Sequence, residues 1–167
     1  GALLHLINDM FMMACLFSAA GIIYAHARTR NIYELRKINR ALPLTMAVFV
    51  IGALSVIGVP PLCGFFSKWY LGLGAIQAKQ WPFVWVILFS SLLNTVLFFR
   101  IIEQVYFPLR DAVPAGHIHH DAPIRLDPVP LGELIPITCL ACCIILLGLF
   151  SNTLITHFIS RAIPGVF

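Results

Sequence analysis

The stretch that decides the fold of this 167-residue sequence is Gly58-Val59-Pro60-Pro61-Leu62-Cys63-Gly64, followed at once by Phe65-Phe66-Ser67-Lys68-Trp69-Tyr70-Leu71. It lies inside an apolar region from residue 43 to residue 78. As one straight helix this region would extend about 54 Å, against a hydrocarbon core of about 30 Å. Two prolines and two glycines within seven residues cannot continue an ordinary helix. We therefore expect a helix that is broken at Gly58, Pro60, Pro61 and Gly64.

The composition around this break is that of a membrane protein. Hydrophobic residues make up 60% of the chain and charged residues only 11%, whereas a soluble domain carries about 25% charged residues. Within residues 1–27, 41–99 and 129–160 the only Asp, Glu, Lys or Arg residues are Asp9, Lys68, Lys79 and Glu133. Apolar stretches of more than about 18 residues predict membrane-spanning helices, so we expect an integral membrane protein.

The apolar stretches predict an all-α fold, a polytopic transmembrane helix bundle with one discontinuous helix. The expected spans cover about residues 2–27, 43–78 with a break near 58–64, 81–107 and 131–158, and a polar loop covers 108–130. An alternative counts the two halves of 43–78 as separate short spans. Because the chain starts inside an apolar run without a signal-peptide pattern, we interpret it as the C-terminal part of a longer subunit.

The basic residues are concentrated in the loop after the first span. Its charged residues are Arg28, Arg30, Glu34, Arg36, Lys37 and Arg40. By the positive-inside rule this loop is cytoplasmic. The membrane orientation therefore accounts for the net charge of +4, which does not indicate binding to nucleic acid. With a single broken span, the turn at Lys79-Gln80 is then on the outer side and the loop 108–130 is cytoplasmic. With two spans these assignments invert.

Lys68 is the residue with the clearest functional signal. A lysine near mid-membrane costs a few kcal/mol and usually faces a protein interior or a hydrated cavity. A broken helix exposes backbone groups that are tolerated only where they line such a cavity. An amine held away from bulk water can gain and lose a proton near neutral pH. We interpret Lys68 as a proton carrier. The alternative, a lysine that reaches the interface from a helix end, fits Lys79 better.

His5 and Asp9 form a second candidate group. They are four residues apart and therefore lie on one face of the first span. Histidine titrates near about pH 6.5, and a carboxylate on the same face could exchange a proton with it. The alternative for His5 is a position near the membrane surface at the start of the span.

Other motifs indicate no metal site and no cofactor. We interpret Cys139, Cys142 and Cys143 as small packing residues, because no His or Cys stands at zinc spacing beside them. The histidines of Gly116-His117-Ile118-His119-His120-Asp121 are expected in a solvated loop. No phosphate loop, dinucleotide fingerprint, haem attachment motif or hydrolytic triad is present in the sequence.

The stretch from Pro43 to Tyr70 resembles the antiporter-like membrane subunits shared by Mrp-type cation/proton antiporters and respiratory complex I. The motif around Gly58-Val59-Pro60-Pro61 and Gly64 to Leu71 looks closest to that of the Mrp D-type subunit. The resemblance extends from His5 to about Phe107. It implies about fourteen spans with two central inverted repeats, of which this chain holds part of the second repeat and the closing helices.

The resemblance also implies roles for individual residues. Lys68 matches a lysine or glutamate that takes part in proton transfer in a discontinuous helix of this family. The preceding helix usually carries a His, a second His four residues on, and a Lys four further on. His5 matches this pattern, whereas Asp9 and Met13 depart from it. The departure removes a central proton carrier or transfers its role to Asp9.

Three hypotheses follow for the function. The leading one is a proton-translocating membrane subunit of a multi-subunit cation/proton antiporter, with Lys68 in a hydrated half-channel. Its partners would be other membrane subunits, protons, Na⁺ and the lipid bilayer of a bacterial inner membrane. The alternative is a proton-pumping subunit of an NADH:quinone oxidoreductase or hydrogenase complex, with the redox chemistry in other subunits. The third, prompted by Met13, is a structural subunit that has lost conduction.

Overall fold

The computed structural model describes residues 1–27, 39, 42–106 and 129–154. All regular structure in these ranges is helical, which confirms the all-α prediction. The helices are α1 (Ala2–Ala27), α3 (Pro43–Ile57), α4 (Cys63–Gln77), α5 (Trp81–Tyr106), α6 (Leu131–Leu149) and α7 (Ser151–Leu154). The basic loop after the first span and the histidines of the loop 108–130 lie outside the described residues.

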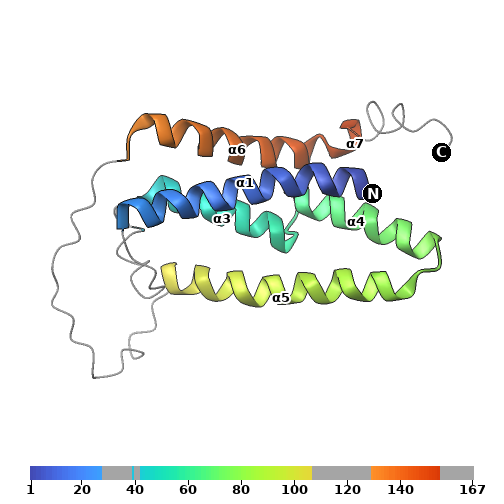
Figure 1. Ribbon diagram of the computed structural model, residues 1–167. Coiled ribbons are helices and arrows are strands. Elements are labelled where there is room, and N and C mark those ends of the chain that lie inside the picture. The colour runs from blue at the N-terminus through green and yellow to red at the C-terminus, as the bar shows by residue number, and fades with distance from the viewer. Residues whose placement is uncertain (28–38, 40–41, 107–128, 155–167) are drawn as a thin grey trace, which may run out of the picture.

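The described helices form an elongated bundle with α3 and α4 end to end along its length (Figure 1). Helix α1 packs against both α3 and α4, and so does α5. Each half of the pair has 15 residues, about 22 Å at the rise of an α-helix, which is shorter than a hydrocarbon core of about 30 Å. Only together are they long enough to reach across a membrane. The single broken span therefore stays our prediction.

Three of the described helices are long and apolar enough to cross a membrane by themselves. They are α1, α5 and α6, within the windows Ala2–His26, Trp81–Glu103 and Leu131–Leu149. The prediction of a polytopic transmembrane bundle is therefore confirmed. Helix α6 packs against α1, α3 and α4, and in Figure 1 it lies on the side of these helices opposite to α5.

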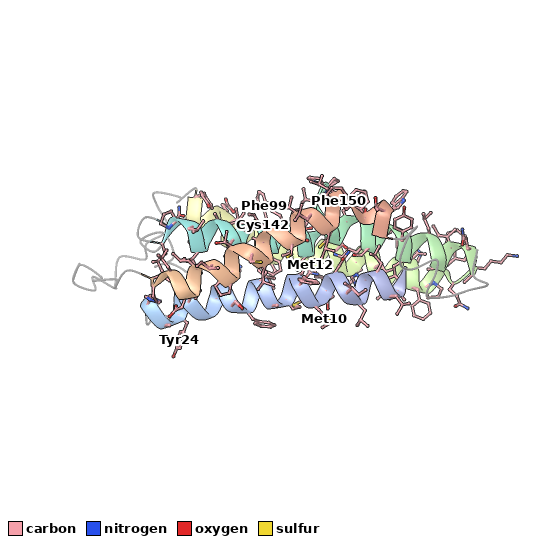
Figure 2. All side chains as sticks on the ribbon, turned by 90° about the horizontal axis from the view of Figure 1, so that it is seen from above. Met10, Met12, Tyr24, Phe99, Cys142 and Phe150 are labelled. Carbon is pink, nitrogen blue, oxygen red and sulfur yellow. The ribbon has the colours of Figure 1, made fainter. Side chains whose placement is uncertain are left out.

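The bundle buries small and medium-sized side chains and leaves large apolar ones outside. Figure 2 shows Met12 of α1 turned toward the neighbouring helices and Met10 turned away from them; their exposed fractions are 1% and 68%. On α5 the large side chains of Trp85 and Phe89 are exposed. An apolar exterior of this kind is expected where lipid or further apolar helices surround the bundle.

Glycines allow the close approach of helices around the break. A Cβ at Gly64 would overlap the backbone carbonyl of Ser55 on α3, and a Cβ at Gly148 would overlap the carbonyl of Pro61. Both positions therefore require the absence of a side chain. The contact at Gly148 packs α6 directly over the interruption between α3 and α4.

Candidate functional site

The interruption between α3 and α4 follows from local backbone chemistry. Helix α3 ends at Gly58, which has a left-handed φ of 99° and donates its N–H to the carbonyl of Leu54. Such a conformation at a helix C-terminus is favourable for glycine. Pro60 and Pro61 have no N–H to donate and are joined by a cis peptide bond. The chain resumes a helix only at Cys63.

Lys68 of α4 reaches back to the end of α3. Its Nζ donates hydrogen bonds to the carbonyl oxygens of Val56, at 2.6 Å, and Ile57, at 3.3 Å, and to Oγ of Ser91 on α5, at 2.9 Å. The last carbonyls of a helix have no partner within it and carry the negative end of the helix dipole. An ammonium group has three hydrogens, so all three are used. The amine is therefore held inside the bundle by polar groups.

His5 of α1 contacts the residue that precedes Lys68. Its Nδ1 lies 3.2 Å from Oγ of Ser67, and that hydroxyl donates to the carbonyl of Gly64 at 3.1 Å. With the single hydroxyl hydrogen directed to Gly64, Nδ1 of His5 is assigned as the donor to Ser67. The other ring nitrogen, Nε2, then carries the lone pair. In this arrangement the buried Ser67 favours the tautomer in which His5 can accept a proton on Nε2.

Asn8 ties α1 to the first turn of α4. Its Nδ2 donates to the carbonyl of Cys63 at 3.0 Å, while its buried Oδ1 has no partner within the described part of the chain. Ser55 of α3 contacts the same turn, since its Oγ accepts from the N–H of Gly64 at 3.2 Å. The bond from Gly64 to Ser55 satisfies an N–H that the break would otherwise leave unpaired, and the bond from Asn8 adds a second donor to the carbonyl of Cys63.

Asp9 is half-buried and lies near the other two predicted site residues without touching them. Its carboxylate is close enough to His5 and Lys68 to interact with both electrostatically. Among the described residues it forms no hydrogen bond and no salt bridge. The structure therefore gathers His5, Asp9 and Lys68 around the break, where His5 bonds to Ser67, Lys68 bonds to Ser91, and Asp9 bonds to neither of the other two.

Two serines complete the site. The sequence predicted that Ser91 could pack helices or hydrate a path, but not its contact with Lys68, and it did not predict the contact of Ser67 with His5. Ser91 is a small polar residue of the third predicted span, and Ser67 belongs to the motif before Lys68. A signal for both exists in the sequence. Ser67 is next to the lysine, and Ser91 belongs to a small polar group in a mainly apolar span, together with Ser90, Asn94 and Thr95.

A cavity of about 370 Å³ lies between α4 and α5. Lys68 and Ser91 line it, together with apolar residues that include Trp69, Leu73, Ile76 and Leu88. On α4 the lining residues continue from the break toward the C-terminal end of the helix, and on α5 they occupy its N-terminal half. The cavity therefore extends from Lys68 toward the turn that joins the two helices at residues 78–80.

The described part of the chain offers no metal centre. No group of three or more His, Cys, Asp or Glu side chains comes together there. Cys139 and Cys142 are exposed free cysteines, and Cys143 is a free cysteine that is partly exposed. The chemistry that this site can support is the binding and movement of protons by an amine, an imidazole and hydroxyl groups.

Comparisons with known proteins agree with this membrane architecture. A family model described as "NADH:quinone oxidoreductase/Mrp antiporter, TM" matches residues 1–94. The N subunit of the NADH-quinone oxidoreductase of Desulforudis audaxviator is 39% identical over 98% of this chain and 33% of its own length. The D-type subunit of the Na(+)/H(+) antiporter of Bacillus subtilis is 31% identical over 81% of this chain and 27% of its own length.

The chain thus spans a third or less of the length of these curated relatives. The sequence identity with the quinone oxidoreductase subunit is higher than that with the antiporter D subunit. The comparisons therefore do not favour the antiporter D subunit over the quinone oxidoreductase subunit. The family predicted from the helix break and Lys68 is nevertheless confirmed. The chain belongs to the family of transmembrane subunits shared by NADH:quinone oxidoreductases and Mrp antiporters.

Proposed function

We propose that this chain is part of a proton-translocating membrane subunit of a multi-subunit complex, and that Lys68 takes up and releases the transported proton. The observation that carries the proposal is the setting of its amine. Three hydrogen bonds hold the part-buried Nζ at the broken helix, against the end of α3 and Ser91 of α5. Such a group is a functional candidate because an ionisable side chain within a span is costly without a role.

The surroundings of Lys68 are suited to a reversible proton site. The carbonyls of Val56 and Ile57 stabilise the charged amine through the negative end of α3. His5 lies on the α1 side, with Nε2 available for a proton, and the cavity lies on the α5 side. A proton acceptor on one side and a cavity on the other give the amine two directions of exchange.

Two kinds of complex are candidates for the host of this subunit. The 39% identity with a subunit of an NADH-quinone oxidoreductase, over nearly the whole chain, supports the membrane arm of a redox-driven complex as the first candidate. The 31% identity with a Na(+)/H(+) antiporter subunit supports a cation/proton antiporter as the second, with Na⁺ as the coupling ion. In both cases the proposed partners are other membrane subunits, and the proposed location is a bacterial inner membrane.

The test is proton transport by the full-length subunit in its purified complex, reconstituted into lipid vesicles with an internal pH-sensitive dye. Transport is driven either by NADH with a quinone or by a Na⁺ gradient, and the effective driving force identifies the complex. Lys68→Ala should lower transport at least tenfold while the complex stays assembled. Lys79→Gln is the matched control, because Lys79 is an exposed lysine at the turn after α4. Full transport by Lys68→Ala would refute the proposal.

A further inference from the structure

The three partners of the Lys68 amine differ in one chemical respect. The carbonyl oxygens of Val56 and Ile57 can only accept hydrogen bonds. The hydroxyl of Ser91 can accept and can also donate. In the charged state this difference has no consequence, because the ammonium donates to all three. It matters as soon as the amine loses a proton.

A neutral amine has two hydrogens and one lone pair. If the lone pair faced the oxygen of Val56 or Ile57, two acceptors would oppose each other inside the bundle, which is unfavourable. Facing Ser91, the lone pair can accept the hydroxyl hydrogen. Only one of the three contacts of Lys68 can therefore reverse its direction when the proton leaves.

We propose that Ser91 is the relay residue through which Lys68 releases its proton into the cavity between α4 and α5. This inference rests on the function proposed above and adds the atom and the route of release. In the release step the N–H bond of Lys68 that points to Ser91 breaks, and that proton bonds to Oγ. The original hydroxyl hydrogen of Ser91 passes to a water molecule in the cavity. The new O–H of Ser91 then donates to the lone pair of Nζ. One N–H and one O–H bond have broken, one O–H bond has formed on Ser91 and one on water, and the net change is one proton passed from Lys68 to water.

The position of Ser91 fits this step. It contributes to the wall of the same cavity as Lys68 and stands 2.9 Å from the amine. The cavity of about 370 Å³ has room for a water molecule beside Lys68 and Ser91, the two groups of its otherwise mainly apolar lining that can bind one. One turn further along α5, Oγ1 of Thr95 donates a hydrogen bond to the backbone carbonyl of Ser91, at 2.7 Å.

The route also has a direction. From Lys68 the cavity follows the C-terminal part of α4 and the N-terminal part of α5, toward the turn at residues 78–80. His5 on α1 contacts Ser67, and both lie outside the set of residues that line this cavity. Release through Ser91 therefore leads away from His5, so that uptake and release use different faces of α4.

The experiment compares two variants of nearly equal shape in the full-length subunit within its complex. Ser91→Thr keeps the hydroxyl, whereas Ser91→Val replaces it by a methyl group. Transport into vesicles is measured together with the subunit content and the thermal stability of the complex. We expect Ser91→Thr to retain transport within about twofold and Ser91→Val to lose it by about tenfold or more. Ser90→Val is the control, because Ser90 is the exposed neighbouring serine on α5.

The outcomes separate this inference from the function on which it rests. Equal transport by Ser91→Val and Ser91→Thr, alongside an inactive Lys68→Ala, would overturn the relay and leave the proton-carrier role intact. Transport by Lys68→Ala would overturn the proposed function itself. If Ser91→Val prevents assembly of the complex, Ser91→Ala takes its place in the comparison, because alanine adds no atoms at this position. The relay then requires that Ser91→Ala transports less than Ser91→Thr, and equal transport by these two variants would overturn it.

Discussion

The amine of Lys68 lies 2.6 Å from the carbonyl oxygen of Val56, so a side chain of α4 closes the open end of α3. This contact serves structure and chemistry at once. It pairs a carbonyl that no helical N–H can reach, and it holds a positive charge at the negative end of a helix. The interrupted helix thereby creates the site that stabilises the proton on Lys68. Variants that keep the charge but prevent its loss should separate the two roles.

Lys68→Arg is such a variant. A guanidinium can donate to the carbonyls of Val56 and Ile57, but it does not lose its proton at any physiological pH. We expect the complex to assemble while proton transport falls at least tenfold, as in Lys68→Ala. Subunit content and vesicle transport measure the two effects. Transport by Lys68→Arg near the unaltered level would show that proton exchange at this residue is not required.

Ser67→Ala tests the tautomer of His5. Without the hydroxyl, Nδ1 of His5 loses its hydrogen-bond acceptor, and the proton is free to move to Nε2. We expect transport to fall by about fivefold, which corresponds to a hydrogen bond of about 1 kcal/mol. Solid-state NMR of ¹⁵N-labelled histidine should show the Nδ1–H tautomer in the unaltered protein and a mixture in the variant.

An NMR spectrum with Nε2–H as the main form in the unaltered protein would contradict this assignment. Ser55→Ala serves as a comparison. That variant removes another buried hydroxyl beside the break, one that accepts from the N–H of Gly64 and does not contact His5. Its imidazole signals should match those of the unaltered protein.

Asp9→Asn tests whether the carboxylate is a carrier or only a neighbouring charge. Because Asp9 forms no hydrogen bond among the described residues, no direct transfer path connects it to His5 or Lys68. We expect transport to fall by about fivefold or less, since only an electrostatic interaction of about 1 kcal/mol is lost. A complete loss in Asp9→Asn, with Asp9→Glu active, would instead make Asp9 an obligatory proton carrier.

The helix break could be predicted from sequence because its causes are local. Proline lacks an N–H wherever it stands, and a glycine beside it accepts the left-handed conformation found at Gly58. Hydropathy likewise predicted the transmembrane helices, because the thickness and apolar character of the lipid bilayer set the length and composition of such helices. The membership of a transporter family followed from the same stretch.

The partners of the site could not be predicted in the same way. Ser91 is 23 residues from Lys68, and Ser67 is 62 residues from His5. Such contacts depend on how each helix is rotated about its axis, which packing against several neighbours decides. The spacing of His5 and Asp9 predicted a shared face of α1, but it could not show that His5 pairs across to α4 instead.

Gly64→Ala tests the packing that brings α4 against α3 at the break. The added methyl group would overlap the carbonyl of Ser55, a backbone atom that cannot turn aside, so the first turn of α4 must move. Forcing a group into a packed interior costs about 1–3 kcal/mol, and displacement of this turn also disturbs the approach of Lys68 to α3. Thermal unfolding of the full-length subunit in detergent should therefore show a lower midpoint for this variant.

The matched control for that substitution is Gly74→Ala in the same helix, where no described atom beyond the adjoining residues and the helix's own backbone lies within 4 Å of the added carbon. There the better helix propensity of alanine favours stability by up to about 1 kcal/mol. We expect an unchanged or higher midpoint for Gly74→Ala, in contrast to the lower one for Gly64→Ala. Equal midpoints for the two variants would mean that α4 is not packed against Ser55 in the assembled protein.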